Sequence, residues 1–115
     1  MSAVSSGQRP VHVVKADLFR VLGHPARVRI LEILRDDGEQ SVGALQLALG
    51  LSDGNTSQHL AALRRIGVVE SRRQGTTIYY RVENTRVFDL LAAGRDVVKA
   101  RIAGEQAMLR ELRTG

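Results

Sequence analysis

The stretch "SDGNTSQHLAALRRIG", Ser52 to Gly67, decides the fold that this sequence predicts. At 100° per residue, one arc of a helix would gather Thr56, Leu60, Leu63 and Ile66. The opposite arc would carry Gly54, Asn55, Gln58, Ala61, Ala62 and Arg65, with Ser57 and His59 at its flanks. Small side chains let a helix approach a groove wall closely, and amide side chains both donate to and accept from base edges. The stretch therefore predicts a helix whose outer face reads DNA.

A shorter helix is predicted directly before it, from "SVGALQLALGLS". Ser41 can cap this helix and Gly50 can end it. The joint "GLS" is a glycine-containing turn of the kind that sets two helices at a steep angle in a helix-turn-helix. Because such spacing also occurs in unrelated folds, the following segment is needed to decide.

That segment, "VVESRRQGTTIYYRV", alternates with a period of two around Gln74-Gly75-Thr76 and predicts a β-hairpin. Between Arg64 and Arg86 there are six arginines and two glutamates, in a chain of formal net charge +5. A basic hairpin beside a presented helix is the winged-helix arrangement, in which the hairpin follows the phosphate backbone or enters the minor groove. The predicted DNA-binding residues are Asn55, Ser57, Gln58, His59, Arg65, Arg72, Arg73, Gln74 and Thr76.

Three further helices complete the predicted fold, which is mainly α with a small β-hairpin. The first runs from Val13 to Leu22, and the second begins at Pro25 with an inward stripe of Ile30, Leu31 and Leu34. The last runs from Thr85 to about Arg113 and would be about 42 Å long. Its apolar stripe is longer than a domain this small covers alone, so the sequence predicts a homodimer.

Length and composition limit the other possibilities. The 115 residues suit a flexible arm over 1–12 and one winged helix-turn-helix DNA-binding and dimerisation domain over 13–113. The absence of cysteine excludes disulfides, thiol catalysis and thiolate metal sites in this chain. No segment approaches the roughly 18 apolar residues of a membrane span, so a cytoplasmic protein with no membrane partner is expected.

The segments "LGHPARVRILEIL" and "SQHLAALRRIGVV", followed by the hairpin and a long helix, resemble the ArsR/SmtB-type winged-helix repressors of bacteria. The resemblance covers roughly Ala16 to Leu112. It implies a homodimer built from the first and last helices, bound to the double-stranded DNA of a palindromic operator and acting as a repressor. The dimer interface would then include Val14, Leu18, Leu91, Val98, Ile102 and Leu109. Asp53 and Gly54 depart from the polar neutral residues common there, which puts direct contacts at these positions in doubt.

The resemblance also bears on sensing. Many members bind metals through a cysteine pair, or through Asp and His on the last helix, and this chain has neither set. We therefore predict no metal site and no cofactor, with a metal-responsive repressor using a nonstandard Asp/His site as the alternative. Against a metal-binding role, His24 is expected to be structural, His59 to be packed or to face a phosphate, and His12 to have no role. The inducer stays open among a small organic effector, control by abundance and a partner protein.

Two other classes of function are the alternatives to a DNA-binding regulator. A protein-interaction module is one, in which the hairpin contacts another protein. An enzyme is the other, and the sequence argues against it because it has no cysteine, no glycine-rich phosphate loop and no paired-carboxylate pattern.

Overall fold

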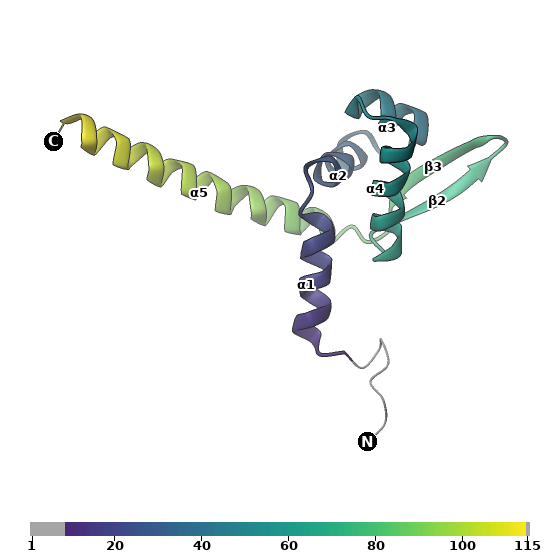
Figure 1. The fold of residues 1–115 in the computed structure, drawn as a ribbon, viewed down its shortest axis with the longest axis horizontal. Helices are drawn as coiled ribbons and strands as arrows, with labels where there is room; N and C mark the ends of the chain where they lie inside the picture. The colour runs from purple at the N-terminus through teal and green to yellow at the C-terminus, as the bar shows by residue number, and fades with distance from the viewer. Residues whose placement is uncertain (1–8, 115) are drawn as a thin grey trace, which may run out of the picture. The chain divides into compact units, whose positions relative to one another are not determined.

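The computed structural model describes residues 9–114. The chain forms two compact units, one ending at Asn84 and one beginning at Thr85. The first unit contains α1 (Val11–Leu22), α2 (Pro25–Asp37), β1 (Gln40–Ser41), α3 (Val42–Leu49), α4 (Asp53–Arg65), β2 (Val69–Gln74) and β3 (Thr77–Val82) (Figure 1). The second unit contains α5 (Val87–Thr114). This is the predicted winged helix-turn-helix, with α3 and α4 as its two helices and the β2–β3 hairpin as its wing.

Helix boundaries follow the capping residues in the sequence. The Ser41 side chain accepts a hydrogen bond from the Ala44 backbone N–H at 3.1 Å at the start of α3. Ser52 does the same for α4, and Gly50 ends α3 in the left-handed conformation with φ 66°. Of the arm predicted over 1–12, residues 1–8 lie outside the described range, and α1 begins at Val11.

The sheet has three antiparallel strands in the order β1-β3-β2. In the hairpin, Arg72 lies opposite Tyr79 and Gln74 opposite Thr77, with Gly75 in the turn at φ 63°. The strand β1, in which Ser41 pairs with Tyr79, was not predicted from the sequence. Because Ser41 also caps α3, this short strand joins the wing to the helix-turn-helix.

The core of the first unit is aliphatic and lies between α2, α3, α4 and β2. The predicted inward residues of α2 are buried, and so is Ile33. On α4, Thr56, Leu60 and Leu63 are all 0% exposed, as the helical period predicted. Ala62 was wrongly placed on the outer arc, since it is only 5% exposed. The reason is that α4 packs against α1, α2, α3 and β2, so more than one side of it is covered.

The second unit is one unbroken helix of 28 residues that begins two residues after Thr85. Its large apolar side chains remain in contact with solvent along most of its length, namely Leu90, Val97, Val98, Ile102, Met108, Leu109 and Leu112. Over residues 9–114, no helix has the length and apolar character needed to cross a membrane.

Candidate nucleic-acid interface

The outer face of α4 presents polar side chains to solvent. Asn55, Ser57 and Gln58 are exposed, whereas Thr56 and Leu60 between and after them are fully buried. The Ser52 side chain accepts a hydrogen bond from the Asn55 backbone N–H at 3.4 Å and so fixes the first turn. The buried residues hold α4 in place, while the exposed amide and hydroxyl groups are available to a ligand.

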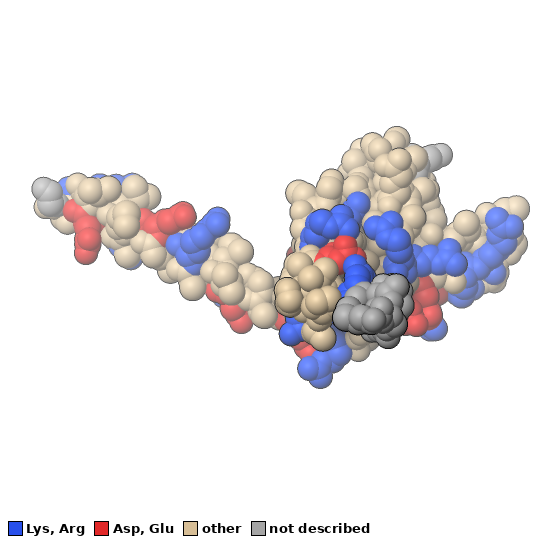
Figure 2. Space-filling model, turned by 60° about the horizontal axis from the view of Figure 1, so that its bottom comes forward, with Lys and Arg blue, Asp and Glu red and all other residues tan. Residues whose placement is uncertain are grey.

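The wing carries a second group of exposed polar side chains. Arg73, Gln74 and Thr76 are all exposed, on both sides of the turn at Gly75. Figure 2 shows Lys and Arg atoms along the projecting hairpin on the face in view. Arg81 on β3 is also exposed but is ion-paired with Glu70 of β2, so its charge is partly compensated.

The wing and the helix-turn-helix border one concave surface. A hollow of about 470 Å³ is lined by Ser57 of α4, by Ser41 and Gly43 at the start of α3, and by Thr76 and Tyr80 of the wing. Two predicted DNA-binding residues on separate elements, Ser57 and Thr76, therefore line the same hollow. A convex polyanion that enters this concavity would meet both at once.

Arg72 is engaged within the protein. Its Nε lies 3.0 Å and 2.9 Å from the two carboxylate oxygens of Glu39, its Nη2 donates to Glu39 Oε1 at 2.6 Å, and its Nη1 donates to Gln74 Oε1 at 2.8 Å. The guanidinium also lies 4.6 Å from the ring centre of Tyr79. Hydrogen bonding to Arg72 lowers the pKa of Glu39 below its usual value, and the pKa of Arg72 is raised in turn. Glu39 was not predicted from the sequence, because it precedes Arg72 by 33 residues and belongs to no motif.

His59 lies at the edge of the outer face and packs against α2. Its ring centre is 4.3 Å from that of His24, and its Nδ1 accepts a hydrogen bond from Arg27 Nε at 3.2 Å. Arg27 also donates to the Val21 carbonyl at 3.1 Å. Burial, followed by the charges of His24 and Arg27, lowers the pKa of His59. His24 itself caps α2 by accepting from the Ala26 N–H at 3.1 Å, the structural role expected for it.

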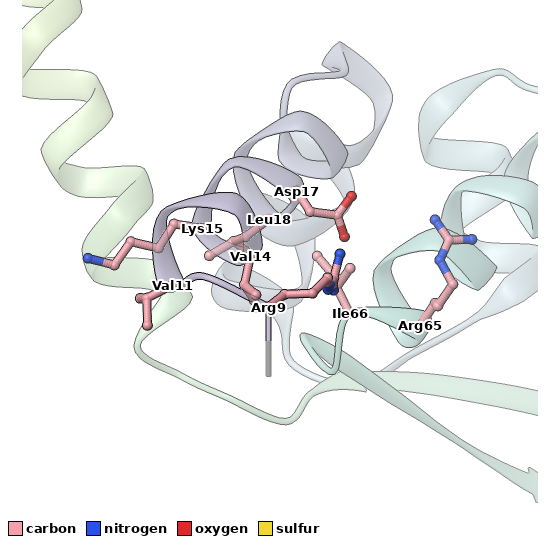
Figure 3. Close-up of a pocket in the computed structure, with 8 residues that line it drawn as sticks. All are labelled: Arg9, Val11, Val14, Lys15, Asp17, Leu18, Arg65 and Ile66. Atoms are coloured by element: carbon pink, nitrogen blue, oxygen red, sulfur yellow. The ribbon is translucent and has the colours of Figure 1, made fainter. Parts of the chain in front are cut away.

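Arg65 lies at the opposite end of α4 from Asn55, beside α1. It lines a hollow of about 750 Å³ with Val14, Leu18, Ile66 and four other residues (Figure 3). Lys15 points away from the other labelled side chains there. Asp17 is hydrogen-bonded to Arg20, which lowers the pKa of Asp17. The hollow thus places two residues of the predicted dimer interface, Val14 and Leu18, next to Arg65.

Within 9–114, no group of three or more His, Cys, Asp or Glu side chains is arranged to hold a metal ion. His24 and His59 form the one ring pair in that range, and each uses its Nδ1 to accept an N–H.

Comparison with known proteins assigns this arrangement to a family. The family described as "Bacterial regulatory protein, arsR family" matches residues 24–71. The HTH-type transcriptional regulator Rv0081 of Mycobacterium tuberculosis is 41% identical over 107 residues, which is 92% of this chain and 93% of that protein. The chain belongs to the ArsR family. As the sequence resemblance predicted, it is a DNA-binding transcriptional regulator and not an enzyme.

Solved structures of ArsR-family proteins agree with the fold. The crystal structure of Rv0081 matches with a TM-score of 0.74, covering 86% of this chain and 98% of that one. A homodimeric winged helix-turn-helix DNA-binding domain from Mycobacterium bovis is 32% identical with a TM-score of 0.70, covering 86% and 91%. The transcriptional repressor BigR from Xylella fastidiosa is 35% identical with a TM-score of 0.65, covering 72% and 84%.

Proposed function

We propose that this ArsR-family protein is a homodimeric repressor that binds a palindromic operator. The observation that carries the proposal is the exposed polar face of α4, with Asn55, Ser57 and Gln58, beside an arginine-bearing wing. In this proposal α4 enters the major groove and reads base edges with its amides. Arg73, Gln74 and Thr76 contact the backbone or the minor groove and fix the register.

Dimerisation follows from the apolar surface that one protomer leaves uncovered. On α1, Val14 is 41% exposed and Leu18 is half-buried. On α5, Val98, Ile102 and Leu109 are 46%, 43% and 52% exposed. Burying these apolar residues on both copies removes them from water. In the proposed two-fold dimer, the two α4 helices would lie about 34 Å apart, which is one turn of DNA. The homodimeric relative from M. bovis and the repressor from X. fastidiosa support both parts of the proposal.

Sensing in this proposal uses neither a metal nor a thiol. The chain has no cysteine, and α5 contains no histidine. Native mass spectrometry with added zinc checks this point, because stoichiometric uptake would instead favour the metal-responsive alternative.

The test of base reading begins by selecting the fragments of the source genome that the protein binds. Fluorescence anisotropy then measures the affinity of the protein for a selected operator and for a random duplex. Gln58→Ala should weaken operator binding by about 1–3 kcal/mol with little change on random DNA. Arg73→Ala should weaken binding to both and reduce the salt slope by about one.

The matched control is Arg110→Ala, which removes the same charge from the exposed outer surface of α5. It should leave both affinities close to wild type. Equal losses on both duplexes for Gln58→Ala would contradict base reading by α4, and failure to retain any duplex at low salt would contradict the proposal as a whole.

A further inference from the structure

The side chain of Arg27, on α2, joins three helices of the first unit. Its Nη1 donates to the carbonyl of Val21 in the last turn of α1 at 3.1 Å, and its Nε donates to Nδ1 of His59 on α4 at 3.2 Å. The last carbonyls of a helix have no partner within it, so Arg27 supplies one to α1. Arg27 is half-buried, and no Asp or Glu of the described range is ion-paired with it. These two donors therefore go to neutral acceptors.

The contact with Arg27 decides which ring nitrogen of His59 carries a proton. A guanidinium has donors only, so Nδ1 must offer its lone pair, and the proton of the neutral ring then lies on Nε2. The ring also packs against His24, whose own Nδ1 accepts the N–H of Ala26. A protonated His59 would turn a second donor and a second positive charge toward Arg27. The contact therefore requires the neutral ring.

We propose that Arg27 is a positioning residue for operator recognition, which fixes through His59 how α4 is turned toward the duplex. This rests on the proposed function, in which α4 reads base edges. Buried side chains such as Leu60 and Leu63 hold the inner face of α4, but the burial of apolar surface has no direction. A hydrogen bond is directional, and His59 directly follows Gln58 in the chain. The bond thus sets the rotation of α4 about its axis beside a residue that reads bases.

Few charged groups act on His59 besides Arg27. Burial is the first cause of its lowered pKa, followed by the charges of His24 and Arg27. Of the other elements packed against α4, α3 has no charged or titratable side chain. No charged side chain of α1 or β2 among residues 9–114 contributes to the lowered pKa. Protonation of His59 is therefore the titration that breaks this contact.

The first test reads the proton on His59 by NMR in the absence of DNA. The ¹⁵N shifts of the two ring nitrogens distinguish a proton on Nε2 from one on Nδ1, and the signals that H59N lacks belong to His59. At pH 7.5 the wild-type ring should carry its proton on Nε2. R27M keeps a long unbranched side chain without a donor, so its His59 should show a mixture of both forms and a raised pKa.

The matched control is R29M, the same substitution on the same helix. Arg29 is exposed, and its ion pair with Glu32 is long, at 3.4 Å. The His59 signals of R29M should match those of wild type.

The second test measures the ratio of the affinities for a selected operator and a random duplex at pH 7.5, by fluorescence anisotropy. R27M should lower this ratio by roughly tenfold, which is the discrimination of about one base contact. R29M loses the same charge and should keep the ratio within about twofold of wild type. H59L should resemble R27M, and R27M/H59L should be no weaker than either single variant, because both residues act through one contact. H59N keeps an acceptor for Arg27 and should stay within about threefold of wild type.

The pH profile separates positioning from support of the fold. In wild type the ratio should be constant from pH 7.5 to about pH 6.5 and should fall below it, as Nδ1 of His59 takes up a proton. In H59N the ratio should stay high at all these pH values, and in R27M it should stay low. Circular dichroism at each pH establishes that the variants are folded where the ratio is measured. Should R27M fail to fold, H59L against H59N makes the same comparison on α4.

Three results would overturn the positioning role. These are a wild-type His59 that carries its proton on Nδ1, an R27M protein with the wild-type ratio, and an H59N ratio that falls with pH as steeply as that of wild type. A wild-type protein that binds no duplex would contradict the proposed function and the positioning role with it. Equal discrimination by wild type and R27M would contradict the positioning role alone.

Discussion

Arg72 and Glu39 form a forked ion pair that joins the wing to the segment between α2 and β1, with a closest approach of 2.6 Å between Arg72 Nη2 and Glu39 Oε1. The arginine also stacks on Tyr79, its neighbour across the hairpin. The charge of Arg72, one of the two consecutive arginines of the wing, is therefore compensated within the protein. Arg73, the other one, is exposed and is left to face a phosphate.

The first prediction follows from this pair. Glu39→Gln removes one negative charge next to the wing and leaves the Arg72 charge uncompensated, so binding to any duplex should tighten several-fold. The salt slope should steepen by up to about one. Anisotropy titrations at several salt concentrations on operator and random DNA measure both. Unchanged affinity and slope would mean that this part of the wing lies away from the phosphates.

The second prediction concerns pH. The pKa of His59 is lowered in the folded protein, so the unfolded chain takes up the proton more readily. Stability should be complete above about pH 6.5, the ordinary value for histidine, and should fall as the pH drops from there through the lowered pKa. The melting temperature followed from pH 7 to pH 5 shows this decline.

His59→Asn keeps a hydrogen-bond acceptor for Arg27 but does not titrate. Its melting temperature should therefore depend less steeply on pH in this window. His12→Gln, on the exposed surface of α1, is the matched control and should keep the wild-type slope. If the His59→Asn slope equals the wild-type slope, the pH dependence arises elsewhere.

The third prediction concerns Thr56, whose side chain is 0% exposed on α4. Its hydroxyl has no hydrogen-bond partner among the described residues. Valine has nearly the same shape without the hydroxyl, so Thr56→Val should raise the free energy of unfolding by about 1 kcal/mol. Thr56→Ser keeps the hydroxyl and loses the methyl group, and it should lower stability by about 1 kcal/mol. Urea denaturation measures both, and a destabilised Thr56→Val protein would show that the hydroxyl is bound.

The fourth prediction tests the dimer face. Val98→Asp places a charge in the proposed interface and should weaken dimerisation by about a hundredfold, with a matching loss of operator affinity. Ala100→Asp adds the same charge two residues away on the outer face of α5 and should dimerise normally. Sedimentation equilibrium compares the two, and a dimer that survives Val98→Asp would show that the interface lies on another surface.

Much of the fold was predictable because it rests on local chemistry. The spacing of Thr56, Leu60 and Leu63 fixed the inner face of α4, and Ser41 marked the start of α3. Ala62 was misassigned because a helical wheel assumes one covered side, whereas α4 is covered on several. The strand β1 was missed because two residues carry no alternation, and they become a strand only by pairing with β3 about 40 residues later.

The candidate site divides in the same way. Exposure of Asn55, Ser57 and Gln58 follows from the helical period and could be predicted. The partners of Arg72 and His59 could not, since Glu39 and Arg27 are more than 30 residues away and are brought in by tertiary packing. For Arg72 and His59, the sequence indicates a charged group and an imidazole ring, but not whether that group is already bonded to another residue of the protein.

Ser41 belongs to the sheet through its pairing with Tyr79 and to α3 through its cap on Ala44. The hairpin and the helix pair are consequently joined through a single residue. In the proposed complex with DNA, a movement of α3 would therefore also move the wing.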